Sequence, residues 1–244
     1  MRILSWNILH GGGSRTSSIL EAIARHDPDL LTLQEVRDGA GRDPLLEGLD
    51  ELGFRHRVLS PTSSPRENGV LVAARRPFQA APFPDDTASV PHRPAGAVYA
   101  LRCHFDGEGA EPPLQLIAVR FPQKQAQVPL FEALLALPSA WRLGSSLLIG
   151  DFNCGIPFED SETRTFVCTA WFQQLLRQGW IDAWRRRHRQ GREFSWISRP
   201  QGHGFRYDHA LVSPELDQRI TAVTYDHEVR TAGHSDHSAL LLEA

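Results

Sequence analysis

Lysine is almost missing from this 244-residue chain, since Lys124 is the only lysine among 26 basic residues. The chain therefore offers almost no candidate for Schiff-base chemistry or for a lysine general base. Arginine can hold phosphate through its planar fork of donors, but it does not exchange protons at ordinary pH. Basic contacts to an anionic ligand are expected to stabilise charge and not to move protons.

Cysteine is also scarce, with three residues, Cys103, Cys154 and Cys168, and no C-x-x-C spacing. This pattern disfavours a disulfide framework and a zinc site, and we expect the thiols to be reduced. No window approaches 18 uninterrupted apolar residues, and no charged segment with a long apolar run opens the chain. We therefore expect a cytoplasmic protein with no membrane partner.

The chain has little excess charge, with a formal net charge of −3 and a pI near 6.4. A molecule of this charge does not attract nucleic acid over its whole surface. Any polyanion must be held by local contacts.

Short β-rich runs alternate irregularly with helical patterns, which indicates a mixed α/β fold. The composition is 41% hydrophobic, enough for a core, and no shift in composition marks a linker, so we expect one domain over residues 1–244. Strands are predicted at residues 2–6, 30–36, 55–59, 69–73, 97–103, 114–119, 145–149, 207–212, 220–225 and 238–242. Helices are predicted at residues 17–25, 44–52, 127–137 and 162–178.

The stretch LIGDFNCG, residues 148–155, places polar side chains at the tip of an apolar strand. Asp151 and Asn153 are two residues apart, so on an extended chain they point the same way. An Asp/Asn turn, in which both side chains bond nearby backbone, is the alternative interpretation.

Other predicted strands also end or begin with residues that suit a reactive site. Asn7 and Glu35 follow two of them, Asp208 opens a late strand, and Asp236 and His237 precede the last one. Each alone also fits a turn residue, a solvated end, a salt-bridge partner or a cap. Together they indicate a site that cleaves phosphoesters.

A phosphoester-cleaving site needs a hard cation, and oxygen ligands from Glu35, Asn7 and Asp236 suit Mg²⁺, or Mn²⁺ in its place. His237 titrates near neutrality and can take a proton from water, provided that a carboxylate such as Asp208 orients its ring.

The polar pair at the strand tip has roles in the same chemistry. Asp151 can align the nucleophile or protonate the leaving oxygen. Asn153 can donate amide hydrogens to the phosphate or to the attacking water.

The segments SWN, LQE, GDFN, FSWIS, GFRYDHALVS and GHSDH resemble the motif series of the endonuclease/exonuclease/phosphatase superfamily, most of all the exonuclease III type of apurinic endonuclease. The resemblance runs from Trp6 to His237. It implies a four-layer α/β sandwich, two packed mixed β-sheets flanked by helices, with the site where strand ends meet. It also implies that Glu35 is the principal metal ligand, with Asn7 and Asp236 nearby. Asp151 and Asn153 would lie at the nucleophile and the phosphate. Asp208 would pair with His237, which would contact the phosphate or its attacking water.

Two positions depart from the family pattern. Arg120, in VRFPQK, stands where relatives carry tyrosine or histidine near the phosphate. Arg120 can clamp a phosphate oxygen but cannot protonate a leaving alkoxide, so acid duty would fall to Asp151 or to water at the cation. A surface arginine is the alternative. Leu9 stands where nuclease relatives often carry a polar Asp or Asn, so we expect a lower metal affinity or a metal site that rests more on Glu35.

The substrate is suggested only by weaker signals. Trp196 lies in a segment that resembles the sugar or base pocket of apurinic endonucleases and can stack on a base, although it also suits a core. The arginine tract at residues 185–189 suits a backbone-tracking rim or a solvated helix end. We expect a monomeric phosphodiesterase acting on DNA. The alternatives are a phosphoesterase for a small metabolite, nucleotide or lipid headgroup, and a noncatalytic binding protein of the same fold.

Overall fold

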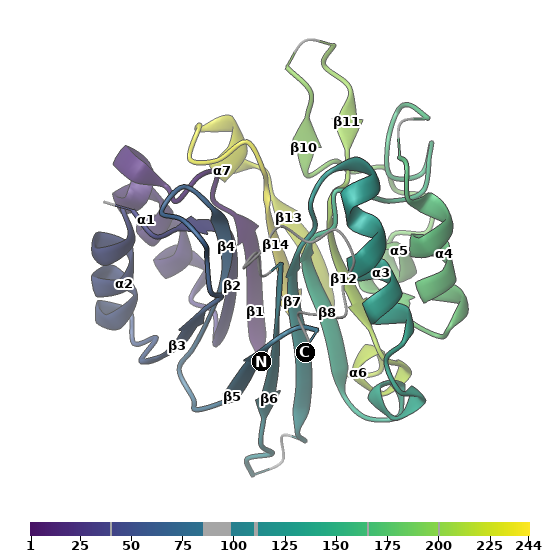
Figure 1. The fold of residues 1–244 in the computed structure, drawn as a ribbon, viewed down its shortest axis with the longest axis horizontal. Helices are drawn as coiled ribbons and strands as arrows, with labels where there is room; N and C mark the ends of the chain where they lie inside the picture. The colour runs from purple at the N-terminus through teal and green to yellow at the C-terminus, as the bar shows by residue number, and fades with distance from the viewer. Residues whose placement is uncertain (40, 85–98, 110–111, 165, 200) are drawn as a thin grey trace.

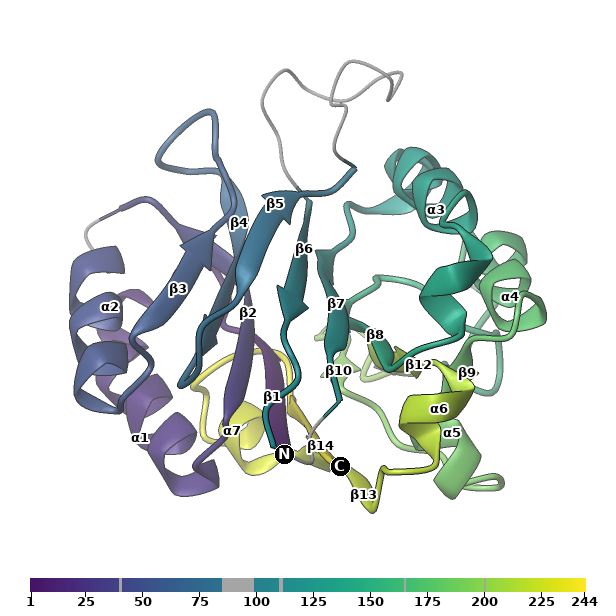
Figure 2. The same ribbon diagram turned by 90° about the horizontal axis from the view of Figure 1, so that it is seen from below.

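Two six-stranded sheets pack face to face between helices (Figure 1, Figure 2). The structure, a computed structural model, describes residues 1–39, 41–84, 99–109, 112–164, 166–199 and 201–244. In order across the first sheet, the strands are β13 (Ala222–Asp226), β14 (Ala239–Glu243), β1 (Arg2–Asn7), β2 (Leu30–Arg37), β4 (Asn68–Ala74) and β3 (His56–Leu59). In the second they are β5 (Gln79–Pro82), β6 (Ala100–Phe105), β7 (Leu114–Arg120), β8 (Ser146–Asp151), β12 (Asp208–Val212) and β9 (Ile181–Asp182).

Helices cover the outer face of each sheet, as both views show. Helices α1 (Thr16–His26) and α2 (Arg42–Glu51) lie on the first sheet, and α3 (Val128–Leu135) and α4 (Thr169–Arg177) lie on the second. Shorter helices are α5 (Ala183–Arg187), α6 (Pro214–Asp217) and α7 (Glu228–Thr231), and a small hairpin pairs β10 (Trp196–Ile197) with β11 (Gly204–Phe205).

Each sheet is mixed, because β1 pairs with β2 and β7 with β8 in parallel while the other strand pairs are antiparallel. The central strands are buried on both faces, which explains their unbroken apolar runs. In β8, Ile149 faces the core between the sheets and Leu148 packs under α3 and α4. The predicted four-layer α/β sandwich is confirmed.

Strand direction brings the polar strand ends to one end of the sandwich, opposite the two chain termini (Figure 1). Asn7 is the last residue of β1, and Asp151 is the last residue of β8. Strand β12 runs antiparallel to β8 with Asp208 opposite Asp151, so the first residue of β12 lies beside the last residue of β8.

The predicted strands are all present within a few residues, although residues 97 and 98 of one of them lie outside the described residues. The helix predicted at residues 162–178 is wrong in its first half, because only Thr169–Arg177 is helical. Before it, the backbone bonds to another segment: Ser161 bridges to Phe205, and Arg206 N–H donates to the Asp160 carbonyl. Tertiary hydrogen bonds have replaced a local helical pattern there.

Strands β5, β9, β10 and β11 were not predicted, because segments of two to four residues carry too little periodicity. Among the residues that the structure describes, no helix has the length and hydropathy that a membrane span requires.

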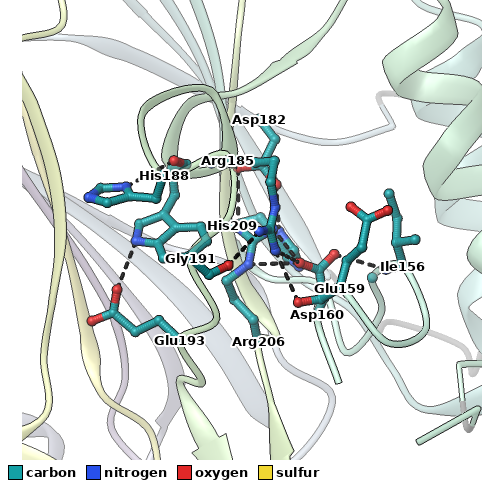
Figure 3. Close-up of polar contacts among 12 residues, drawn as sticks. Ile156, Glu159, Asp160, Asp182, Arg185, His188, Gly191, Glu193, Arg206 and His209 are labelled. Carbon is teal, nitrogen blue, oxygen red and sulfur yellow. Dashed lines mark hydrogen bonds and ion pairs between the residues drawn. The ribbon is translucent and has the colours of Figure 1, made fainter. Parts of the chain in front are cut away.

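A buried charge network fixes the chain just before β12 (Figure 3). Arg206 is 1% exposed, and its guanidinium donates to both carboxylates, with shortest distances of 2.5 Å to Asp160 and 2.6 Å to Asp182. Burial alone would raise the pKa of these carboxyls, but the charge of Arg206 leaves both pKa values below the ordinary range. Arg185 adds a bond to Asp160 at 3.0 Å. The network therefore anchors the two residues that follow Arg206, Tyr207 and Asp208.

Replacing Arg206 with methionine should destabilise the protein by about 3–5 kcal/mol at pH 7, because two buried carboxylates lose their main partner. In the wild type the depressed pKa values give stability that is lost only as pH falls below the ordinary carboxyl pKa of about 4. In Arg206→Met the pKa values rise, so the deficit should shrink as pH falls from 7 to 4. Urea unfolding at several pH values measures this difference.

Arg57→Met is the matched control, because Arg57 pairs with the half-exposed Asp50, where solvent screens the charges, and should contribute much less to stability. Equal losses in the two variants, or a deficit for Arg206→Met that does not change with pH, would contradict this interpretation of the network.

Candidate active site

The strand ends enclose a cleft of about 480 Å³. Every residue that the sequence singles out for catalysis, metal or substrate lines it except Asp208, which lies behind His237, and Arg120. The predicted residues in the lining are Asn7, Glu35, Asp151, Asn153, Trp196, Asp236 and His237. Residues from both sheets therefore meet in one place.

His237 and Asp208 form a buried pair, with Nδ1 of the imidazole 2.8 Å from Oδ2 of the carboxylate. Burial lowers the pKa of His237, but the charge and hydrogen bond of Asp208, with the charges of Asp151 and Asp236, raise it to about 10. The imidazole thus holds its proton at neutral pH, whereas the sequence alone predicted a histidine that titrates near neutrality and takes a proton from water. Asp208 fixes the orientation of the ring, and the second ring nitrogen is the atom left to serve a ligand.

Asp151 is the acceptor at the centre of the cleft. Its Oδ2 accepts from Asn7 Nδ2 and from Asn153 Nδ2, each at 3.1 Å, and its Oδ1 accepts from the Asn153 backbone N–H at 2.9 Å. Burial raises the pKa of Asp151 to about 7, although the positive charge of His237 opposes the shift. A carboxyl with this pKa can exchange a proton at neutral pH.

The turn that was the alternative interpretation of Asp151 and Asn153 is present together with the site. The Asn153 N–H bond to Asp151 is a local Asx-type bond, and Asn153 has a φ of 46°, a left-handed conformation that asparagine tolerates. The same turn directs Asn153 Nδ2 to Asp151 and to the Phe121 carbonyl at 2.9 Å. The hydrogen bonds of Asn153 therefore form the turn and also hold its side chain in the cleft.

Glu35 reaches the cleft through a β-bulge. The pairing of β2 with β4 shifts register between Gln34 and Val36, and Glu35 itself has a φ of 62°. A bulge re-aims a side chain, and a left-handed glutamate is a strained conformation that the surrounding structure must hold. Glu35 Oε2 accepts from the His10 backbone N–H at 3.0 Å and lies 2.9 Å from His10 Nδ1.

The residues predicted to hold a metal fit a hard divalent cation. Asp236 Oδ2 accepts from Trp196 Nε1 at 3.0 Å, while its Oδ1 is buried with no hydrogen-bond partner among the described residues. A buried carboxylate oxygen without a donor is costly, and a cation with oxygen ligands would satisfy it. Glu35 supplies the second carboxylate in the same cleft.

A second group of possible ligands lies deeper in the cleft. Asp151, Asp208 and His237 each offer one ligand atom, and these atoms lie within 4.8 Å of one another. The hydrogen bond between His237 and Asp208 already uses one nitrogen and one oxygen of this group. The donor set at Glu35 and Asp236, made of oxygens alone, suits Mg²⁺ better.

The two departures from the family pattern differ in whether they line the cleft. Arg120 Nε donates to the Asn68 carbonyl at 3.3 Å, and its guanidinium lies 5.6 Å from the centre of the Tyr99 ring. It is not among the lining residues. Leu9 does line the cleft, with a φ of 52°. The phosphate contact predicted for Arg120 stays a prediction.

Trp196 packs against aromatic neighbours and also borders the cleft, while its stacking on a base stays a prediction. It is half-buried against Phe205 and Tyr207, at centroid distances of 5.7 and 5.5 Å, and it also lines the cleft. In the arginine tract, Arg185 bonds to Asp160 and Arg187 bonds to Asp217. These two arginines therefore contribute to the fold.

Several cleft residues were assigned no role from the sequence, among them Gln127, Phe166, Val167 and Tyr207. Tyr207 could have been found, because it directly precedes Asp208. Phe166 could not, because the loop that carries it was predicted as a helix.

Comparison with known proteins agrees with this geometry. The model of the Endonuclease/Exonuclease/phosphatase family matches residues 4–237. A structure of the 3′ phosphatase NExo from Neisseria, bound to product DNA hairpin, is similar with a TM-score of 0.81 and 23% identity over 100% of this chain and 98% of that one. An AP endonuclease from Archaeoglobus fulgidus is similar with a TM-score of 0.80 and 20% sequence identity, over 99% of this chain and 98% of that one. The AP endonuclease LMAP from Leishmania major is similar with a TM-score of 0.76 and 18% sequence identity, over 99% of this chain and 86% of that one. The search of curated proteins found no match.

The chain belongs to the Endonuclease/Exonuclease/phosphatase family. The resemblance predicted from the motifs is confirmed, and so is the enzyme class, a phosphoric ester hydrolase. The structural neighbours share the fold at low identity.

Replacing Asp208 with asparagine should lower the pKa of His237 by more than one unit, because the carboxylate is the main group that raises it against burial. NMR titration of the imidazole in the metal-free protein measures the change. Asp236→Asn is the control and should lower the pKa less, since Asp236 is the smallest of the named contributions. An unchanged His237 pKa in Asp208→Asn would refute the pairing.

Proposed function

We propose that this chain is a Mg²⁺-dependent phosphodiesterase that hydrolyses phosphoester bonds in DNA, as an endonuclease or exonuclease, with abasic sites among its targets. The observation that carries the proposal is the convergence of a histidine–carboxylate pair, His237 with Asp208, and an unpartnered carboxylate oxygen of Asp236 in one cleft. This set joins a proton-carrying group to a cation site, which is what water attack on a phosphodiester requires.

Glu35, Asn7 and Asp236 would hold the cation. Mg²⁺, or Mn²⁺, supplies there the positive charge that phosphate oxygens need as they accumulate charge. The proposed roles of these three residues are to place that charge beside the scissile phosphate and to exclude other ligands.

The remaining residues would position the reactants. His237, held protonated by Asp208, donates to a non-bridging phosphate oxygen, and Asn153 donates an amide hydrogen beside it. Asp151 aligns the attacking water and accepts its proton, which its pKa of about 7 permits. Donors preset in this way are typically worth 10²- to 10³-fold each in rate.

DNA is favoured as substrate because of two kinds of support. The neighbours include a phosphatase bound to a DNA hairpin and AP endonucleases with the same fold. Trp196 offers a ring face at the cleft for stacking on a base or an abasic gap. Arg120 is proposed to add charge to the phosphate, worth about 10²-fold in rate.

A small phosphorylated metabolite, nucleotide or lipid headgroup is the second candidate substrate. The formal charge of −3 favours it, because a chain without net positive charge attracts a long polyanion weakly. Action as a monomer is part of this proposal. The free cysteines Cys103, Cys154 and Cys168 support a reducing compartment such as the cytoplasm.

With Mg²⁺ or Mn²⁺ present, the protein should cleave abasic duplex faster than plain duplex, single-stranded DNA, RNA, a nucleotide panel or bis-p-nitrophenyl phosphate. His237→Ala and Glu35→Ala should each lower kcat by about 10²- to 10⁴-fold, because each removes a group that acts on the reacting phosphate. Steady-state rates across the panel measure this.

If the protein cleaves only small phosphoesters, DNA is not the substrate, and a small phosphorylated metabolite, nucleotide or lipid headgroup takes its place. No detectable cleavage of any substrate, together with tight binding of one ligand, would favour a noncatalytic binding protein instead. Equal turnover by Glu35→Ala and wild type would remove the proposed cation site.

A further inference from the structure

The residues assigned so far leave the leaving oxygen without a proton donor. Arg120 stands at the position where relatives carry tyrosine, but its guanidinium contacts Tyr99 and the Asn68 carbonyl and does not line the cleft. An arginine would in any case not release a proton at ordinary pH. Asp151 already accepts hydrogen bonds from Asn7 and Asn153, and it is assigned to the water.

Tyr207 places a phenol in the same cleft. It is one of the lining residues together with Asp151 and His237, and its ring centroid lies 6.3 Å from that of His237. Its hydroxyl makes no hydrogen bond to any residue that the structure describes, whereas the hydroxyl of the buried Tyr225 donates to the Asp208 carbonyl. The Tyr207 hydroxyl is therefore available to a ligand.

The ring is held in place by aromatic neighbours. Phe205 stacks on it at a centroid distance of 5.2 Å, Trp196 lies at 5.5 Å, and Phe166 meets it edge-on at 6.0 Å. Such packing on several sides restricts the ring to one orientation. A preset donor loses little conformational entropy when it meets the substrate.

The backbone of Tyr207 is fixed as firmly as its ring. Its N–H donates to Ser195 Oγ at 3.0 Å, and its carbonyl accepts from the Phe152 N–H at 2.8 Å. Its neighbours in the chain are Arg206, which anchors the buried charge network, and Asp208, which orients His237. The segment from Arg206 to Asp208 thus positions both the Tyr207 phenol and the His237 imidazole.

The surroundings keep the phenol protonated. Burial, followed by the negative charge of Asp151, raises the pKa of Tyr207 to about 12. A hydroxyl with this pKa is a neutral donor throughout the neutral range. It still gives up its proton to an alkoxide, which is a much stronger base.

We propose that the Tyr207 hydroxyl donates its proton to the leaving oxygen of the scissile phosphoester, since His237 is assigned to a non-bridging phosphate oxygen and Asp151 to the attacking water. This inference rests on the proposed function. As water forms the new P–O bond, the bond to the leaving oxygen breaks, and that oxygen keeps the electron pair and takes the phenolic proton. The water proton goes to Asp151, and solvent water returns a proton to the phenolate.

The test combines a substitution in the substrate, sulfur for the leaving oxygen, with a substitution in the protein, Tyr207→Phe. The cleaved bond is first located from the wild-type products, and the leaving oxygen there is then replaced with sulfur in a second DNA substrate. A thiolate leaves without protonation, because its conjugate acid has a pKa near 8.5. Tyr207→Phe should lower kcat on the oxygen substrate by about 10²- to 10⁴-fold and on the sulfur substrate by less than about tenfold.

Two controls separate this role from a structural one. Tyr207→Phe keeps the ring and its packing, so its thermal unfolding should match the wild type. Arg120→Ala removes only charge stabilisation, so it should slow both substrates by the same factor. Equal loss on both substrates in Tyr207→Phe, or no loss on the oxygen substrate, would overturn the inference while leaving the proposed function intact. A wild type that cleaves neither substrate would overturn both.

Discussion

The cleft depends on one register, the pairing of β8 with β12 that sets Asp151 opposite Asp208. Side chains on a strand alternate with a period of two, so a slip of one residue would turn one of these carboxylates away. The buried network around Arg206 pins the start of β12, and the bond from the Phe152 N–H to the Tyr207 carbonyl continues the pairing past Asp151. Position and chemistry are therefore set by the same backbone hydrogen bonds.

Two buried charge systems lie side by side and differ in purpose. Around Arg206 every carboxylate has a guanidinium partner, which makes the network a support. In the cleft the carboxylates outnumber the cations: His237 is the only buried positive group beside Asp151 and Asp208 among the described residues, and one oxygen of Asp208 and one of Asp236 have no partner there. That excess of negative charge is what a divalent cation and the imidazolium proton would balance.

Much of the site could be predicted because its residues stand at strand ends, where apolar periodicity stops abruptly. Asn7, Asp151 and Asp208 follow from that rule. The pattern of strands and helices indicated a mixed α/β fold, and the resemblance to the family implied its four layers. Contacts set by tertiary packing could not be predicted. Nothing near Arg120 in sequence shows that its guanidinium lies against Tyr99, and the bulge at Glu35 arises only from pairing with β4. Tyr207 enters the cleft because Phe205, Trp196 and Phe166 surround it, from segments up to about forty residues away.

The central claim is that residues from Asn7 to His237 gather around one hydrated cation. Anomalous diffraction from crystals grown with Mn²⁺ tests it most directly, because it locates the ion without reference to activity. The account predicts a single strong peak between Glu35 and Asp236 Oδ1, on the side of the cleft that faces His237. The ion should lie about 2–2.5 Å from each carboxylate oxygen that binds it directly, and farther from one that binds it through a water molecule. A peak seated on His237 and Asp208, or one outside the cleft at saturating Mn²⁺, would contradict it.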